Sequence, residues 1–137
     1  MIEVRRYGSA GPPVVVLDGG PGVPGQVAPL ARALGDAFVV LEPLQRPSGG
    51  EPLTVARHLA DLDEVVRSLG ADARPALVGS SWGAMLALAY AAAHVQAASS
   101  VVAIGSGTFD LEACGRMKAI LSERAALDFD ARYTFAA

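Results

Sequence analysis

The sequence ALVGSSWGAMLALAYAAA, residues 76–93, joins a short apolar run to a longer one through a glycine-flanked serine. The first run, 76–78, has the length and apolar character of a buried strand. The second, 82–94, is apolar on all sides but shorter than the ~20 residues that span a membrane, so we expect a helix in the core. Between them the sequence predicts a tight strand-to-helix turn around Ser81.

Apolar runs on either side of this stretch alternate with helical patterns. We expect further strands at residues 2–7, 14–17, 38–41 and 100–104, and amphipathic helices at 27–34 and 55–69. The segment 42–52 contains prolines and glycines and reads as a polar, exposed loop, and the chain after residue 107 reads as mainly helical. Strands that alternate with helices form parallel sheets. The predicted fold class is therefore α/β, a three-layer α/β/α sandwich with a mostly parallel sheet.

Composition fits one compact domain of this class. The chain has 137 residues, of which 52% are hydrophobic and 18% charged, a balance typical of strands buried on both faces. Its formal net charge is −3 and its 11 Lys and Arg residues are scattered, so we expect no nucleic-acid partner. The single cysteine, Cys114, allows no internal disulfide, and residues 1–6 lack the apolar core of a secretory signal. We therefore expect a cytoplasmic protein with no membrane partner.

The pentapeptide Gly79-Ser80-Ser81-Trp82-Gly83 matches the pattern G-x-S-x-G. Between a strand and a helix this pattern forms a nucleophile elbow, a strained turn that lifts the serine hydroxyl out of the backbone. Ser81 would then lie at a helix N-terminus, where the helix dipole and the N–H of Trp82 favour developing negative charge. The sequence therefore predicts acyl transfer, with Ser81 as nucleophile and Trp82 as one donor of an oxyanion hole.

A glycine-rich loop follows the strand predicted at 14–17, with the sequence Asp18-Gly19-Gly20-Pro21-Gly22. Functional loops of a parallel sheet gather at the carboxyl ends of its strands, so this loop should lie beside the elbow. An oxyanion hole needs a second donor from such a loop. The N–H of Gly20 is the candidate.

Three motifs, in order along the chain, resemble those of proline-iminopeptidase-like α/β-hydrolases. Residues 18–22 resemble their His-Gly-Gly-Pro-Gly loop, 79–83 their elbow, and 45–49, Gln-Arg-Pro-Ser-Gly, their Gln-Arg-Gly-x-Gly loop. The resemblance covers residues 14–107 and implies a truncated α/β-hydrolase fold, with residues 1–110 as the N-terminal part of the core and 111–137 as the start of a cap. It also implies a serine hydrolase that cleaves an ester, amide or N-terminal peptide bond of a small molecule or short peptide, without cofactor or metal.

Two residues depart from the motifs of that family. Asp18 replaces a histidine, so a carboxylate could lie near the oxyanion hole and oppose catalysis unless it is turned away or paired. Pro47 replaces a glycine, which removes a backbone donor and fixes φ.

The usual acid and histidine partners of the nucleophile are not evident. In this superfamily they follow the serine, with the histidine last, yet no histidine follows His94. At ~1.5 Å rise per residue, His94 would lie nearly ~20 Å along the helix from Ser81, too far to act as its base. His58 reads as a solvated histidine near Asp61. Asp110 follows the last predicted strand and is the candidate acid, and strong activity of this chain alone is not expected.

Two other functions compete with the hydrolase. Residues 20–25 also satisfy G-x-G-x-x-G after a strand, with Glu42 as the acidic residue of a dinucleotide-binding fold. Pro21 and Pro24 argue against this function because they offer no N–H to a pyrophosphate. The other alternative is a non-catalytic, degenerate hydrolase-fold protein.

The last predicted strand, 100–104, has a consequence for self-association. The superfamily places a further strand outside it, and this chain contains no such strand. We therefore expect an exposed, apolar sheet edge through which the protein associates with itself.

Overall fold

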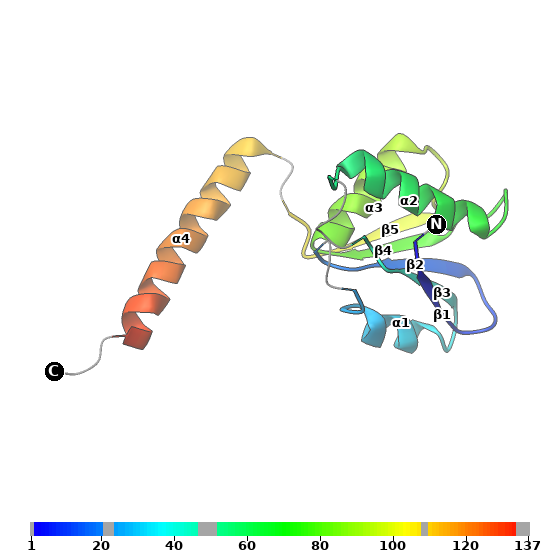
Figure 1. Cartoon of the computed structure of the whole chain (residues 1–137), viewed down its shortest axis with the longest axis horizontal. Coiled ribbons are helices and arrows are strands. Elements are labelled where there is room, and N and C mark those ends of the chain that lie inside the picture. Colours follow the sequence, from blue (N-terminus) through cyan, green and yellow to red (C-terminus); the bar gives the residue numbers. More distant parts are fainter. Residues whose placement is uncertain (1, 21–23, 47–51, 108–109, 134–137) are drawn as a thin grey trace. The chain divides into compact units, whose positions relative to one another are not determined.

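The computed structural model describes residues 2–20, 24–46, 52–107 and 110–133. These residues form two compact units, Met1–Ser106 and Gly107–Ala137. The first contains a sheet and the helices that pack on it, and the second contains α4, Leu111–Tyr133 (Figure 1). The helix predicted after residue 107 is confirmed, whereas its role as the start of a cap stays a prediction.

The described part of the first unit contains a five-stranded sheet, in the order β1-β3-β2-β4-β5. Its strands are β1 Val4–Tyr7, β2 Pro13–Leu17, β3 Val39–Pro43, β4 Ala76–Ser80 and β5 Ser100–Ile104. Only β1 runs antiparallel to its neighbour, and the β2–β3, β2–β4 and β4–β5 pairs are parallel. The predicted mostly parallel sheet is confirmed.

Helices cover both faces of this sheet (Figure 1). Helix α1, Ala28–Leu34, lies on one face, and α2, Val55–Ser68, and α3, Trp82–Ala93, lie on the other. Alternate residues of β2 show this division, because Val14 and Val16 pack in the cluster that includes Ala31 of α1, whereas Leu17 packs with residues of α2 and α3. The three-layer α/β/α sandwich is therefore confirmed.

The expectation of a polar, exposed loop at 42–52 is wrong at its beginning. β3 extends through Glu42 and Pro43, and Glu42 is fully buried. The hydroxyl of Tyr7, in the paired strand β1, donates a hydrogen bond to the Glu42 carboxylate, so an acidic residue continues the strand where the apolar run stops. Gln45 is also buried, with 6% of its surface exposed. Residues 47–51 lie outside the described residues.

Strand β5 is an edge of the sheet in the described part of the chain, where it pairs with β4. Four of its five residues are exposed, including Val102 at 48% and Ile104 at 45%. The expected self-association through this edge stays a prediction.

Candidate active site

Ser81 lies directly between the end of β4 and the start of α3, as the elbow pattern predicts. Its backbone dihedrals, φ of 50° and ψ of −112°, belong to a region that residues other than glycine rarely adopt. The Ser81 N–H donates to the carbonyl of Ile104 at 2.8 Å, which fixes the turn against the end of β5. Ser81 is an exposed residue. The turn therefore has the strained backbone of a nucleophile elbow at the protein surface.

The two glycines of the motif allow this sharp turn. A Cβ at Gly79 would lie 2.2 Å from the carbonyl oxygen of Gly83, and one at Gly83 would lie 2.4 Å from that of Leu17. Both distances are below any real Cβ contact. The spacing of the pattern is therefore a packing requirement, because α3 begins directly against β4 and the end of β2.

The loop after β2 lies against the elbow. A Cβ on Gly19 would be 3.2 Å from Cβ of Ser81, so these two backbones approach closely. The Gly19 N–H donates to Oε1 of Gln26, and no hydrogen bond joins the Gly20 N–H to another described residue. Gly20 has a φ of +107°, a conformation that glycine adopts without strain. Of these two amides, Gly20 has the N–H available to an oxyanion.

The carboxylate of Asp18 is turned into this loop and paired there. Its two oxygens accept hydrogen bonds from the N–H groups of Val27, at 2.9 Å, and Gly25, at 3.2 Å, and the residue is 1% exposed. The carboxylate thus closes the loop on itself. Asp18, which replaces the histidine of the family motif, is therefore paired, and this is the condition under which it need not oppose catalysis. Pro21 and Gly22 lie outside the described residues, as does Pro47.

Trp82 begins α3, so its backbone N–H has no intrahelical acceptor and is available to an anion. Its indole Nε1–H donates to Oε1 of Gln45 at 2.9 Å, and Nε2 of Gln45 donates to the carbonyl oxygen of Asp18 at 3.0 Å. One buried amide therefore links the elbow helix to the glycine loop. Nothing in the sequence assigned this role to Gln45, although its place directly after a strand, in the third motif, was a signal.

His58 is buried, with 3% of its surface exposed, so the expectation of a solvated histidine is wrong. Its ring packs edge-on against the indole of Trp82, with 5.7 Å between ring centroids. Burial is the main cause that lowers the pKa of His58 below its ordinary value, the neighbouring Asp61 opposes the shift, and Arg46 adds to it. Nε2 of His58 has no hydrogen-bond partner among the residues that the structure describes. The amphipathic pattern of residues 55–69 could not predict this environment, because Trp82 and Arg46 act on His58 from other parts of the chain.

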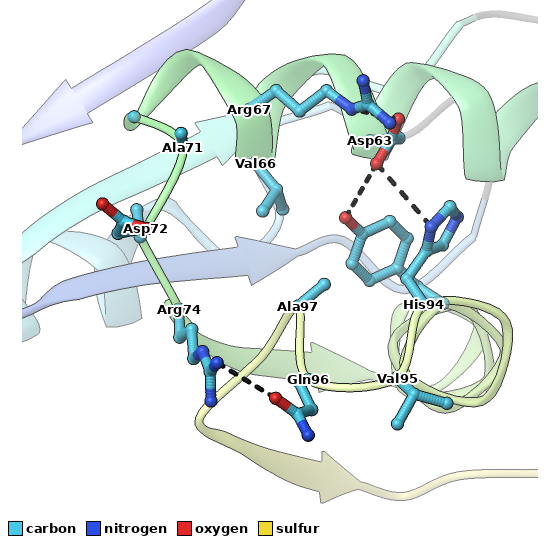
Figure 2. Close-up of a pocket in the computed structure, with 13 residues that line it drawn as sticks. Asp63, Val66, Arg67, Ala71, Asp72, Arg74, His94, Val95, Gln96 and Ala97 are labelled. Carbon is cyan, nitrogen blue, oxygen red and sulfur yellow. Dashed lines mark hydrogen bonds and ion pairs between the residues drawn. The ribbon is translucent and has the colours of Figure 1, made fainter.

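His94 lies at the opposite end of the sheet from Ser81. It lines a hollow of about 790 Å³ formed by the ends of α2 and α3 and by residues that precede β4 and β5 (Figure 2). Its Nδ1 is 3.8 Å from a carboxylate oxygen of Asp63, and its ring stacks on Tyr90, whose hydroxyl donates to the same carboxylate. Burial and the bond to Asp63 raise the pKa of Tyr90 to about 12. His94 is thus part of a separate polar cluster.

Asp110 belongs to the second unit, whereas Ser81 belongs to the first. Its carboxylate accepts a hydrogen bond from the N–H of Ala113 at 2.7 Å, at the start of α4. This contact caps a helix N-terminus. The assignment of Asp110 as the triad acid stays a prediction.

The dinucleotide-binding alternative requires two groups to contact the nucleotide, and in the structure both already have hydrogen-bond partners within the protein. The Glu42 carboxylate is buried and bonded to Tyr7, and the Gly25 N–H is bonded to Asp18. Neither is available to a ribose or a pyrophosphate.

Among the described residues, no group of three or more His, Cys, Asp or Glu side chains could hold a metal ion. None of the described helices is long and apolar enough to cross a membrane.

Comparisons with known proteins agree with this architecture. A family model described as alpha/beta hydrolase fold matches residues 12–137, and the comparison with curated proteins gave no match. Similar solved structures include an enol-lactonase from Burkholderia xenovorans, with 24% identity, a TM-score of 0.62, and coverage of 72% of this chain and 41% of the other. E-2-(acetamidomethylene)succinate hydrolase is 24% identical, with a TM-score of 0.68 and coverage of 95% and 53%.

A lipase-like protein from Acinetobacter baumannii is 20% identical, with a TM-score of 0.69 and coverage of 79% of this chain and 38% of the other. The chain thus spans about half the length of these proteins or less. At these identities the likeness concerns the fold alone. Together with the match of the family model over most of the sequence, it shows that the chain belongs to the alpha/beta hydrolase fold family.

Proposed function

We propose that this chain carries the nucleophile and the oxyanion hole of a serine hydrolase. The observation that supports this function most directly is the backbone of Ser81, a positive φ of 50° in a residue that lies between a strand and a helix. A strained turn of this kind persists where the surrounding structure over-determines it, and such turns cluster at reactive sites. Ser81 is exposed, so its hydroxyl is the group that we assign to the reaction.

The chemistry follows from the groups around Ser81. Oγ of Ser81 attacks the carbonyl carbon of an ester or amide, and the carbonyl oxygen takes the negative charge, which the N–H groups of Gly20 and Trp82 stabilise. The proton of Oγ passes to a base and then to the leaving group, and water releases the acyl group from the serine. Among the described residues no hydrogen bond joins His58 or His94 to Ser81, so the base comes from outside this set.

The proposed substrate is a small molecule or short peptide with an ester, amide or N-terminal peptide bond, as the likeness to proline iminopeptidases implies. In the proposed full site, Asp110 or a later residue supplies the acid. Neither a cofactor nor a nucleic acid takes part, and we place the activity in the cytoplasm. The solved relatives include enzymes named as lactonase and hydrolase, which supports cleavage of an ester or amide bond by this chain's family.

A fluorophosphonate tests this function, because it phosphonylates a serine that can attack and stabilise an oxyanion-like product. In a full-length form of the protein that also supplies the base, we expect a covalent adduct on Ser81, located by mass spectrometry, and its loss in Ser81→Ala. Ser80 and Ser106 serve as internal controls because they lie in the same chain. An adduct on either of them, or one that persists in Ser81→Ala, would show that the nucleophile is assigned wrongly.

A second candidate is a hydrolase fold without turnover. The observation that favours it is the state of the two histidines, since His58 is buried against Trp82 and His94 is paired with Asp63. Hydrolysis of p-nitrophenyl acetate by the chain and by Ser81→Ala separates the two functions. Without added base we expect equal rates, because the base is not among the described residues. Turnover that added imidazole restores only in the presence of Ser81 favours the enzyme, and equal rates that persist with imidazole favour the non-catalytic protein.

The chain should have no measurable affinity for NADH or NADPH. The physical reason is that Glu42 and the Gly25 N–H already have partners, Tyr7 and Asp18. Titration of the nucleotide followed by its fluorescence is the measurement. Micromolar binding that disappears in Glu42→Ala would contradict the proposal and favour the dinucleotide fold.

A further inference from the structure

The two donors of the proposed oxyanion hole come from separate segments of the chain. Gly20 belongs to the loop after β2, and Trp82 begins α3. Preorganised donors stabilise a developing charge because they need not move when it forms, and a misplacement of about 1 Å costs about 100-fold in rate. Some contact must therefore fix one segment relative to the other.

The side-chain hydrogen bonds inside the glycine loop do not serve this purpose. Asp18 binds the N–H groups of Gly25 and Val27, and Gln26 binds that of Gly19, so these contacts close the loop on itself. They give the loop its shape but do not connect it to α3.

The amide of Gln45 makes the connection from a third segment, directly after β3. Trp82 Nε1–H can only donate and the Asp18 carbonyl can only accept, so the amide has one orientation, with Oε1 towards the indole and Nε2 towards Asp18. With 6% of its surface exposed, Gln45 makes both bonds away from bulk water, where unmade bonds are costly. The Asp18 carbonyl lies two residues before Gly20, and the indole belongs to the residue that supplies the other donor.

We propose that Gln45 is a positioning residue, whose side-chain amide holds the glycine loop and the elbow helix at the spacing that aligns the N–H groups of Gly20 and Trp82. This inference rests on the proposed function, since it assigns a purpose to the spacing of those two donors. The amide itself touches no reacting atom.

Two variants of Gln45 test the bonds of its amide, and a third variant is the control. Gln45→Met keeps the length of the side chain and removes both bonds. Gln45→Glu keeps an acceptor for the indole but sets an ionised oxygen against the Asp18 carbonyl, and protonation of that carboxyl restores a donor. Tyr90→Phe is the matched control, because it removes one side-chain hydrogen bond, to Asp63, at the other end of the sheet.

The first measurement is phosphonylation of Ser81 in the full chain. We expect kinact to fall about 10–100-fold in Gln45→Met, with an unchanged concentration for half-saturation, because binding of the reagent does not require the aligned donors. Gln45→Glu should react slowly at neutral pH and recover towards the wild-type rate, compared at the same pH, as the pH falls. Tyr90→Phe should react as the wild type does. Wild-type kinact in Gln45→Met, or an equal loss in Tyr90→Phe, would overturn the proposal.

The second measurement does not depend on activity. Trp82 is the only tryptophan of the sequence, so its emission reports directly on the bond to Gln45. We expect a shifted emission and faster hydrogen exchange of residues 18–20 in Gln45→Met, and neither change in Tyr90→Phe. If wild-type Ser81 is not phosphonylated even with added imidazole as the base, the proposed function fails, and exchange alone decides the inference: unchanged protection of residues 18–20 in Gln45→Met refutes the link.

Discussion

The buried imidazole of His58 makes folding of this protein sensitive to pH. Burial keeps the ring neutral and lowers its pKa below the ordinary value near 6.5. The unfolded chain therefore binds a proton that the folded chain does not, in the interval between the folded pKa and about 6.5. Stability is present above that interval and is lost as the pH falls through it.

We predict that the free energy of unfolding falls as the pH drops below about 6.5, by up to about 1.4 kcal/mol per pH unit from this one group. His58→Phe removes the titration and keeps a ring against Trp82, so its stability should fall less over the same interval. Chemical denaturation at a series of pH values is the measurement. His94→Gln is the matched control, and a wild-type pH dependence in His58→Phe would show that other groups cause the effect.

At the scale of an element, the carboxylate of Asp18 accepts hydrogen bonds from the backbone N–H groups of Gly25 and Val27, and so joins the two ends of the loop after β2. Asp18→Ala leaves both N–H groups without that acceptor, and we predict a loss of about 3 kcal/mol in the free energy of unfolding. Asp18→Asn keeps one acceptor oxygen, so its loss should be intermediate. Urea denaturation of the three proteins measures the series. Equal stability in all three would mean that solvent replaces the carboxylate.

The elements show how far the sequence alone could predict this molecule. Apolar runs and glycines predicted every strand and helix of the first unit, and the pattern around Ser81 predicted the elbow, because these are local signals of periodicity and sterics. The bonds that arrange the site are not local. Gln45 reaches Asp18 and Trp82 from the segment that follows β3, and Glu42 is buried because Tyr7 of another strand binds it. Such partners depend on the register in which the strands pair, and the spacing of residues along the sequence does not predict that register.

At the scale of the whole molecule, the exposed edge strand β5 predicts association between copies. Val102 and Ile104 are about half exposed, and no lysine or proline in the strand discourages pairing. We predict an apparent mass that rises with protein concentration in chromatography with light scattering. Val102→Lys should reduce it, whereas Val95→Lys, at an 81% exposed position off the sheet, should not. A monomer at all concentrations would contradict the prediction.

The backbone conformation of Ser81 also affects which substitutions would be favoured at this position during evolution. Glycine adopts its positive φ without strain, whereas a residue with a side chain costs about 1–3 kcal/mol in such a conformation. A lineage selected only for a stable fold would therefore gain by exchanging Ser81 for glycine, a change that leaves the neighbouring contacts of Gly79 and Gly83 intact. The proposed nucleophilic role of Ser81 accounts for serine at a position where glycine would be less strained, because only the hydroxyl offsets that cost.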